Sequence, residues 1–258
     1  MLTKSTIRLI TSLRQRKFRC QEKLFVAEGP RLVGEMLPAF RCRLLLATQE
    51  WMTTEGRQWH DKPLQEVTEA ELERVSTLKT PQQVLALFEI PENNDSERLL
   101  FDPQCLNIAL DDVQDPGNLG TIIRLADWFG VHHIWCSLHT ADVWNPKVVQ
   151  ATMGALARVN VHYVNLPSFL SALPVDCPTY GTSLHGDSLW DMPLDARGFI
   201  VMGNEGNGLS PEVESLCQQR VYIPNFPAGQ QTTESLNVAM ATGIVLAEFR
   251  RRQSLHRP

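Results

Sequence analysis

The sequence predicts an α/β protein with two domains, the second of them built on a mostly parallel β-sheet. Between residues 106 and 223, short apolar runs of strand length alternate with helical patterns. Runs that are apolar at nearly every position are typical of strands buried on both faces, as in a parallel sheet covered by helices. The polar segment PENNDSER at 91–98 separates this part from a shorter region with similar alternation. We therefore expect one domain at 1–95 and another at 99–258.

The individual elements follow from apolar runs and from helical spacing. In the smaller domain, strands are expected at 24–27, 43–47 and 84–90, and helices at 31–37 and 69–75. The last of these helices carries acidic residues in its first turn, where they favour a helix start. In the larger domain, the expected strands are 106–110, 133–136, 158–163, 179–181, 199–202 and 220–223.

Charge is distributed unevenly along a chain whose formal net charge is −5. Residues 1–43 contain ten Lys or Arg and three Glu, and the last ten residues contain four Arg and no acid. The segment between them is therefore strongly acidic. Basic ends on an acidic chain suggest an anionic polymer as a partner, although a basic helix exposed to solvent explains the same pattern.

Features that would direct the chain to a membrane or out of the cell are lacking in the sequence. The longest apolar runs fall far short of the roughly 20 residues that a membrane-spanning helix needs. The first residues do not contain the apolar core of a signal peptide. The six cysteines are dispersed without a C-x-x-C pair, which indicates reduced thiols. The sequence thus predicts a cytoplasmic protein with no membrane partner.

The first candidate motif, DDVQDPGNLGTIIRLADWFG, spans 111–130. A strand is expected to end at Asp111, a Pro-Gly turn follows, and a helix begins near Asn118, whose side chain suits an N-cap. Apolar residues recur at helical spacing, and Arg124 falls on the opposite side of that helix. Arg124 is therefore either a solvated residue on a helix flank or an anion-binding arginine near the carboxyl end of a strand.

The second motif, GFIVMGNEGNGLSPEVESL, spans 198–216 and is rich in glycine. A strand leads into 203–208, where three glycines permit close approach of the backbone to a ligand. Ser210 is expected to cap the helix that follows. The glycine spacing fits neither the G-x-G-x-x-G pattern nor the P-loop, so a nucleotide-binding oxidoreductase is disfavoured. Glu205 adds a carboxylate to this candidate ligand-binding loop.

The third motif, at 220–252, joins a strand to a helix through a polar loop. The helix is expected to begin near Ser235. Its small residues permit close packing against a neighbour; they are Ala239, Ala241, Thr242 and Gly243. The arginines at 250–252 suit the negative end of the helix dipole, which explains them without a ligand.

Two further patterns are weak. A cluster that resembles a metal site consists of His132, His133, Cys136 and His139, but its spacing fits no standard zinc pattern. No metal is therefore expected. A hydrolase triad using Ser235 and His185 is disfavoured because the sequence has no G-x-S-x-G elbow.

Three of these segments, taken in order, resemble the motifs of the SpoU/TrmH family of RNA ribose 2′-O-methyltransferases, which belongs to the SPOUT superfamily. They are NLGTIIR from Asn118, GNEGNGLS from Gly203, and IP at 223–224 followed by SLNVAMA from Ser235. The resemblance covers about 106–250 and includes ATMGALARV at 151–159, which is similar to the family's segment between its first two motifs. The N-terminal KFRCQEKLFVAEGPRLVGEML is similar to the family's RNA-recognition domain, which resembles ribosomal proteins.

The resemblance implies an enzyme that uses S-adenosylmethionine, acts on RNA, forms a homodimer and has a trefoil knot in its larger domain. Ribosomal RNA is the expected substrate because of the extra N-terminal domain, and transfer RNA is the alternative. A non-catalytic RNA-binding or ribosome-assembly factor on the same fold would be marked by loss of the polar motif residues, which are present here.

The resemblance also implies roles for single residues. The polar active-site positions are Asn118, Arg124, Glu205, Ser235 and Asn237. The cofactor-binding positions are Gly203, Asn204, Gly208, Ile223, Leu236 and, more loosely, Thr182. In the basic N-terminal region, the expected RNA contacts are Arg14, Arg16, Lys17 and Arg19. The family assigns removal of the hydroxyl proton to Arg124, but a guanidinium stays protonated in proteins, so we expect this residue to hold phosphate and position the hydroxyl. The stretch NFPAGQQTTE at 225–234 departs from the family's common pattern.

Overall fold

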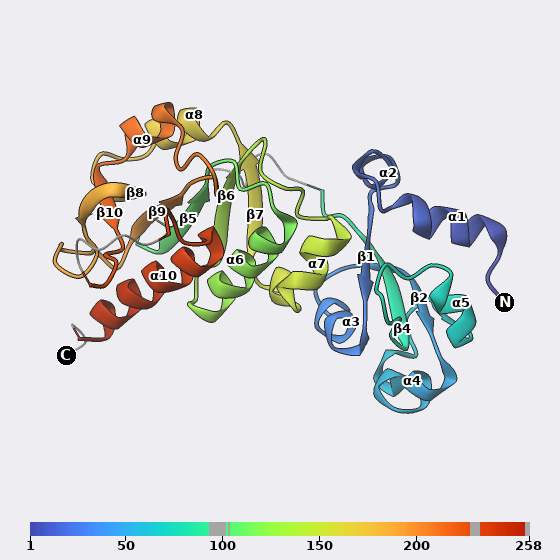
Figure 1. The fold of residues 1–258 in the computed structure, drawn as a ribbon. Helices are drawn as coiled ribbons and strands as arrows, with labels where there is room; N and C mark the ends of the chain where they lie inside the picture. Colours follow the sequence, from blue (N-terminus) through green and yellow to red (C-terminus); the bar gives the residue numbers. More distant parts are fainter. Residues whose placement is uncertain (93–101, 103, 228–232, 256–258) are drawn as a thin grey trace. The chain divides into compact units, whose positions relative to one another are not determined.

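The computed structural model describes residues 1–92, 102, 104–227 and 233–255, and these form two compact units (Figure 1). The first unit comprises residues up to 92 together with 142–157, and the second comprises the remaining described residues. The expected linker at 91–98 falls almost wholly outside the described residues. The domain limits at 95 and 99 therefore stay a prediction.

The first unit contains a four-stranded sheet in the order β1-β4-β2-β3. Its strands are β1 (Leu24–Glu28), β2 (Cys42–Ala47), β3 (Leu64–Glu66) and β4 (Val84–Glu89). Strand β4 runs antiparallel to β1 and β2, whereas β3 runs parallel to β2. All five residues of the edge strand β1 are buried because helices of the same unit cover it.

The helical segments of this unit are α1 (Lys4–Ser12), α2 (Arg16–Glu22), α3 (Pro30–Met36), α4 (Gln49–Thr53), α5 (Glu69–Glu73), α7 (Pro146–Thr152) and the 3-10 segments Glu55–Trp59 and Ala155–Ala157. The three strands and two helices expected from the sequence are present, with ends that differ by no more than two residues. The short strand β3 and the helices α1, α2 and α4 were not expected. The packing of 142–157 with this unit was not expected either.

Arg19 is buried within the first unit, with 2% of its side chain exposed. Its guanidinium donates to the carbonyl oxygens of Leu13 (2.7 Å) and Arg14 (3.0 Å), and it forms an ion pair with Asp142 in which Nε lies 3.1 Å from Oδ2. A buried guanidinium needs such partners because its desolvation is costly. Arg19 therefore joins α2 to the 142–157 segment, and its charge is already neutralised.

The second unit is a six-stranded, wholly parallel sheet in the order β10-β8-β9-β5-β6-β7. Its strands are β5 (Leu106–Leu110), β6 (His133–Ser137), β7 (Asn160–Val164), β8 (Thr179–Ser188), β9 (Gly198–Met202) and β10 (Gln219–Tyr222). The six expected strands and their parallel arrangement are confirmed. Strand β8 is longer than expected, and its pairing with β10 shifts register between Arg220 and Val221.

Helices cover both faces of this sheet (Figure 1). Helices α8 (Leu166–Ser171) and α9 (Pro211–Leu216) pack on one face, where their apolar residues join Ala109, Trp135 and Phe199 in one buried cluster. Helices α6 (Pro116–Trp128) and α10 (Val238–Leu255) lie on the other face. Successive strand residues point to opposite faces, so near-continuous burial of β5 and β9 is what two helical layers require.

Helices α6 and α10 lie side by side and run in the same direction. Near their N-termini, Asn237 donates to Asn118, and at their C-termini Arg250 donates to the carbonyl oxygens of Phe129 (2.7 Å) and Gly130 (3.0 Å). Between these points, a Cβ on Gly243 would lie 3.5 Å from the Leu125 side chain. The small residues of α10 thus pack against a neighbour within the same chain. Among the described helices, none is both long and apolar enough to cross a bilayer.

Candidate active site

A cavity of about 430 Å³ opens at the carboxyl-terminal side of β8, β9 and β10. In open parallel sheets, ligands bind outside the carboxyl ends of the strands, where the strand order reverses direction. The order here reverses between β5 and β9, and the cavity lies on the β9 side of this point, with no lining residue from β5 among the described residues. All six residues expected to bind a cofactor line this cavity: Thr182, Gly203, Asn204, Gly208, Ile223 and Leu236.

The glycine-rich turn after β9 forms one wall of the cavity. Asn204 and Gly208 exchange two backbone hydrogen bonds of 2.8 and 3.0 Å, and Gly208 has a positive φ of 68°. A Cβ on Gly203 would lie 2.3 Å from the carbonyl carbon of Gly208. That distance is far inside van der Waals contact, so this fold of the turn requires glycine at 203.

The side chain of Asn204 holds the same turn in place. Its Oδ1 accepts from the backbone N–H groups of Gly206 (2.9 Å) and Asn207 (3.1 Å), while its Nδ2 donates to the carbonyl oxygen of Asp112 (2.8 Å). Asp112 follows β5 and has a positive φ of 62°. Asn204 therefore ties the glycine-rich turn to the first motif, and its side-chain polar groups are engaged within the protein.

The first motif begins its helix differently from the sequence expectation. Asp115, not Asn118, is the N-cap of α6, because its carboxylate accepts from the N–H of Asn118 (2.9 Å) and Pro116 occupies the first turn. The expectation was wrong because it placed Asp115, Pro116 and Gly117 in a turn before the helix, whereas Asp115 caps the helix and the other two belong to its first turn. The consequence is that the Asn118 side chain is available for other contacts.

Three of the expected polar residues form one hydrogen-bond chain. Asn237 Nδ2 donates to Asn118 Oδ1 (2.9 Å), and Asn118 Nδ2 donates to Glu205 Oε1 (2.8 Å). Asn237 also caps α10, since its Oδ1 accepts from the N–H groups of Ala239 (3.0 Å) and Met240 (3.2 Å). Helix α10 therefore begins at Val238, three residues later than expected. The chain joins all three motifs at one place.

The remaining two polar residues, Ser235 and Arg124, are not part of this hydrogen-bond chain. Ser235 lines the cavity with Glu205. Arg124 is exposed on α6, six residues after Asn118, and it has no hydrogen-bond or ion-pair partner among the described residues. An arginine held on a rigid helix without an internal partner can bind an external anion, because the planar guanidinium matches phosphate and carboxylate oxygens.

The cavity is acidic. Its lining includes Glu205, Glu214 and Glu234 and, within the described part of the chain, no Lys or Arg. Glu214 forms an ion pair with Arg220, in which Oε1 of Glu214 lies 3.3 Å from Nε of Arg220. A carboxylate-lined cavity favours a positively charged ligand by Coulomb attraction. Glu214 lies within the second motif and Glu234 within the third, but neither was singled out from the sequence as a site residue.

The candidate metal cluster does not assemble. Among the described residues, no group of three His, Cys, Asp or Glu side chains could hold a metal ion. His133 instead stacks on His162 of the neighbouring strand, with Nδ1 and Nε2 3.0 Å apart. Burial lowers the pKa of His133, and complete burial raises the pKa of the Cys136 thiol.

The geometry defines a class of α/β protein that binds a ligand beyond the carboxyl ends of a parallel sheet, in a cavity lined by a glycine-rich turn. A family model described as the SpoU rRNA Methylase family matches residues 105–247, and an MRM3-like substrate binding domain model matches residues 4–86. The chain belongs to the SpoU rRNA methylase family.

Individual relatives are similar over nearly the whole chain. The 23S rRNA (guanosine(2553)-2′-O)-methyltransferase RlmP of Bacillus subtilis is 32% identical, over 92% of this chain and 93% of its own length. A solved structure from Porphyromonas gingivalis, assigned to the TrmH family of RNA methyltransferases, is 43% identical with a TM-score of 0.84 and covers 98% of this chain and 99% of that one. The SpoU methyltransferase AviRb of Streptomyces viridochromogenes, solved with AdoMet, is 25% identical with a TM-score of 0.85, over 99% of this chain and 100% of its own.

Substitution Gly203→Ala is expected to distort the glycine-rich turn, because its Cβ would collide with the backbone of Gly208. Overpacking of this kind costs about 1–3 kcal/mol, so the thermal unfolding midpoint should fall by several degrees. Gly206→Ala is the matched control, since the nearest atom to its Cβ would be 3.5 Å away. Calorimetric scans that give equal midpoints for the two variants would contradict the assigned role of Gly203.

Proposed function

We propose that this protein transfers the methyl group of S-adenosylmethionine to a ribose 2′-hydroxyl of ribosomal RNA. The observation that carries the proposal is the convergence of the three motifs on one cavity through the chain Asn237–Asn118–Glu205. The polar motif residues are present, and three of them, Asn118, Glu205 and Asn237, are hydrogen-bonded to one another, which favours an enzyme over a non-catalytic RNA-binding factor. The rRNA-methylating relative supports ribosomal RNA over transfer RNA as the substrate.

The cavity residues fit the cofactor. When bound, S-adenosylmethionine supplies a methyl group activated by a positively charged sulfur. The glycine-rich turn lines the cavity, and the carboxylates of the lining complement a cationic ligand. Thr182, Ile223 and Leu236 also line the cavity. We assign these residues, with Gly203 and Gly208, to cofactor binding.

The polar chain and Arg124 supply the groups that methyl transfer to a hydroxyl requires. The hydroxyl must lose its proton and lie in line with the methyl group. Glu205 Oε1 is held by Asn118, and its Oε2 accepts no hydrogen bond from the described residues. We assign Glu205 the role of proton acceptor, with Asn118 and Asn237 orienting it. Arg124 holds an RNA phosphate and thereby positions the ribose, and Ser235 completes the polar lining.

Substitution Arg124→Ala should reduce methyl transfer by at least tenfold and leave cofactor binding nearly unchanged, because Arg124 lies outside the cavity lining. Misplacement of a reacting group can cost about 10²-fold in rate. Methylation of ribosomal RNA with labelled cofactor measures the first quantity, and titration calorimetry with S-adenosylmethionine measures the second. Activity above about a tenth of the wild-type value would exclude the assignment. Failure of the wild-type protein to bind the cofactor would favour the non-catalytic alternative.

The first unit is the proposed RNA-recognition domain. Arg16 and Lys17 are exposed and have no partner among the described residues, and Arg14 is exposed although it also donates to the carbonyl oxygen of Ser76 (2.9 Å). These three cations are placed to contact phosphates. Arg19, which was grouped with them from the sequence, is removed from the proposed RNA-facing set because it is buried and paired with Asp142.

The double substitution Arg16→Glu/Lys17→Glu should weaken RNA binding and flatten its salt dependence. Each lost phosphate contact reduces the slope of log K against log salt by about 0.7 on single-stranded nucleic acid. The matched control is Arg57→Glu/Lys79→Glu, which reverses one exposed Arg and one exposed Lys elsewhere in the unit. Binding titrations at several salt concentrations give the slopes. An unchanged slope for the first pair, or equal changes for both pairs, would rule out a localised RNA-binding surface.

We infer further that the protein forms a homodimer, as the family resemblance implies. Trp128 on α6 and Met240 on α10 are 83% and 63% exposed, and we place the dimer contact on these two helices, which pack against each other. Trp128→Glu/Met240→Glu should shift the protein toward monomer in sedimentation experiments. Val175→Glu, at a residue that is 95% exposed elsewhere in the unit, should not. A monomeric wild-type protein would refute the inference.

A further inference from the structure

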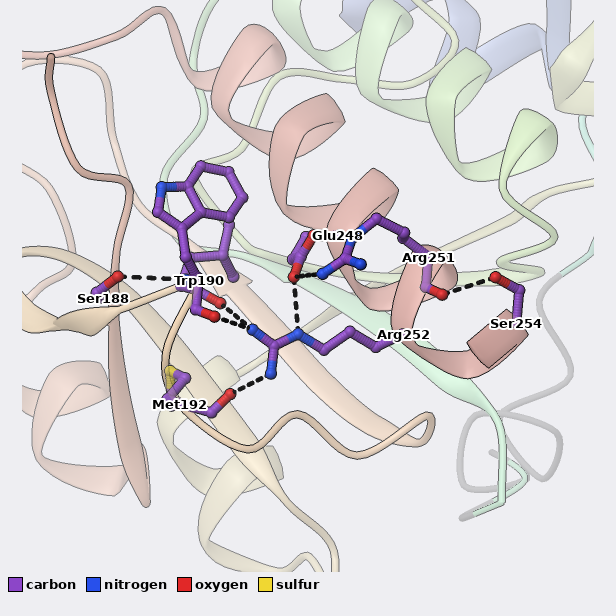
Figure 2. A network of polar contacts seen from close by, with 8 residues as sticks. Ser188, Trp190, Met192, Glu248, Arg251, Arg252 and Ser254 are labelled. Atoms are coloured by element: carbon purple, nitrogen blue, oxygen red, sulfur yellow. Dashed lines mark hydrogen bonds and ion pairs between the residues drawn. The ribbon is translucent and has the colours of Figure 1, made fainter. Parts of the chain in front are cut away.

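The last turns of α10 carry three consecutive arginines that play different roles, and Figure 2 shows the contacts of two of them, Arg251 and Arg252. Arg252 is 19% exposed, and its guanidinium donates to the carbonyl oxygens of Leu189 (3.1 Å), Trp190 and Met192 (2.7 Å). Its Nε donates to Glu248 Oε1 (2.7 Å). One guanidinium therefore holds three carbonyl groups of the turn that follows β8. From the sequence, these arginines were explained by compensation of the helix dipole. That explanation does not require contacts between Arg252 and the turn after β8.

Glu248 fixes the position of Arg252. Its side chain is 6% exposed, and it accepts from Arg251 (2.7 and 2.8 Å) as well as from Arg252. The hydrogen bonds from Arg251, together with those from Arg252, outweigh burial and lower the pKa of Glu248 to about 2. Glu248 is thus a buried, ionised carboxylate at neutral pH. A charge-assisted bond to such a group restricts the long Arg252 side chain to one geometry.

The turn held by Arg252 is continuous with two walls of the cavity. It follows β8, whose residues 182–185 line the cavity, and the N–H of Leu189 donates to the carbonyl oxygen of Tyr222 (2.8 Å) at the end of β10. Tyr222 and the residue after it also line the cavity. At its other end, α10 contributes Val238 and Ala241 to the lining. One helix therefore both lines the cavity and anchors two of its strands.

We propose that Arg252 is a positioning residue for the cofactor cavity: by holding the turn at 189–192 it fixes the walls formed by β8 and the end of β10 relative to α10. This inference rests on the proposed function of the same cavity. Arg252 is not among the described residues that line the cavity, and it acts through the backbone of the turn. The three carbonyl contacts leave its guanidinium engaged within the protein, so it is not assigned to RNA.

Arg251 provides a matched control. It lies on the same helical turn, carries the same charge and shares Glu248, but it is 57% exposed, and among the described residues its guanidinium bonds only that carboxylate. A role in helix-dipole compensation, general charge balance or RNA attraction predicts similar effects at both positions. A positioning role predicts an effect at Arg252 alone.

The experiment compares Arg252→Met, Arg252→Lys and Arg251→Met in the full-length protein, at a temperature well below the unfolding midpoint of each. Calorimetry with S-adenosylmethionine should give a dissociation constant at least fivefold higher for Arg252→Met, a smaller increase for Arg252→Lys, and a change below twofold for Arg251→Met. The KM for the cofactor should rise in the same order, with kcat changed less. The affinity for RNA should be equal in all variants.

Hydrogen exchange without cofactor separates this proposal from the proposed function. Arg252→Met should accelerate exchange at 182–192 and at 221–223, whereas Arg251→Met should not. If these segments respond as expected but the wild type binds no S-adenosylmethionine, the proposed function fails and the anchoring role stands. Unchanged exchange in a folded Arg252→Met or Arg252→Lys protein would overturn the proposal. If Arg252→Met bound the cofactor with a dissociation constant within twofold of the wild-type value, the proposal would be overturned as well. Equal changes in affinity for Arg251→Met and Arg252→Met would also overturn it.

Discussion

The hydrogen-bond chain Asn237–Asn118–Glu205 is the interaction on which the rest of the site depends. An amide has one accepting and one donating end, so the orientation of Asn118 is set by both of its partners. The chain brings together residues that are 87 and 119 positions apart in sequence. It can form only if the helix N-termini of α6 and α10 and the turn after β9 meet at the same edge of the sheet.

The backbone of the site is held by contacts made within the protein. Asn204 bridges the glycine-rich turn and Asp112, two residues after β5, and Arg250 joins the C-terminal ends of α6 and α10. Arg252 holds the turn after β8 in a similar way, through carbonyl oxygens. Buried or partly buried carbonyl groups need donors, and a guanidinium supplies several in a fixed plane. These side chains therefore give rigidity to segments that lack regular structure.

Charge serves different purposes in the two units. The cavity lining is acidic, while the exposed cations Arg16 and Lys17 lie in the first unit. The overall net charge of −5 hides this division. A cationic cofactor would be attracted to the acidic cavity, and an anionic RNA to the exposed cations of the first unit and to Arg124, since electrostatic attraction at exposed sites is local at physiological salt.

The sequence by itself determined the parallel sheet, its six strands and the segments that build the cavity, because apolar runs, glycine clusters and helix starts are local properties. Tertiary structure alone decided which polar side chains are used internally. Arg19 and Arg16 look alike in sequence, yet one is buried against Asp142 and the other is exposed. Asn118 resembled a helix cap, but Asp115 takes that position and frees it to bond Glu205. The partners of these groups lie far away along the chain, so only folding specifies them.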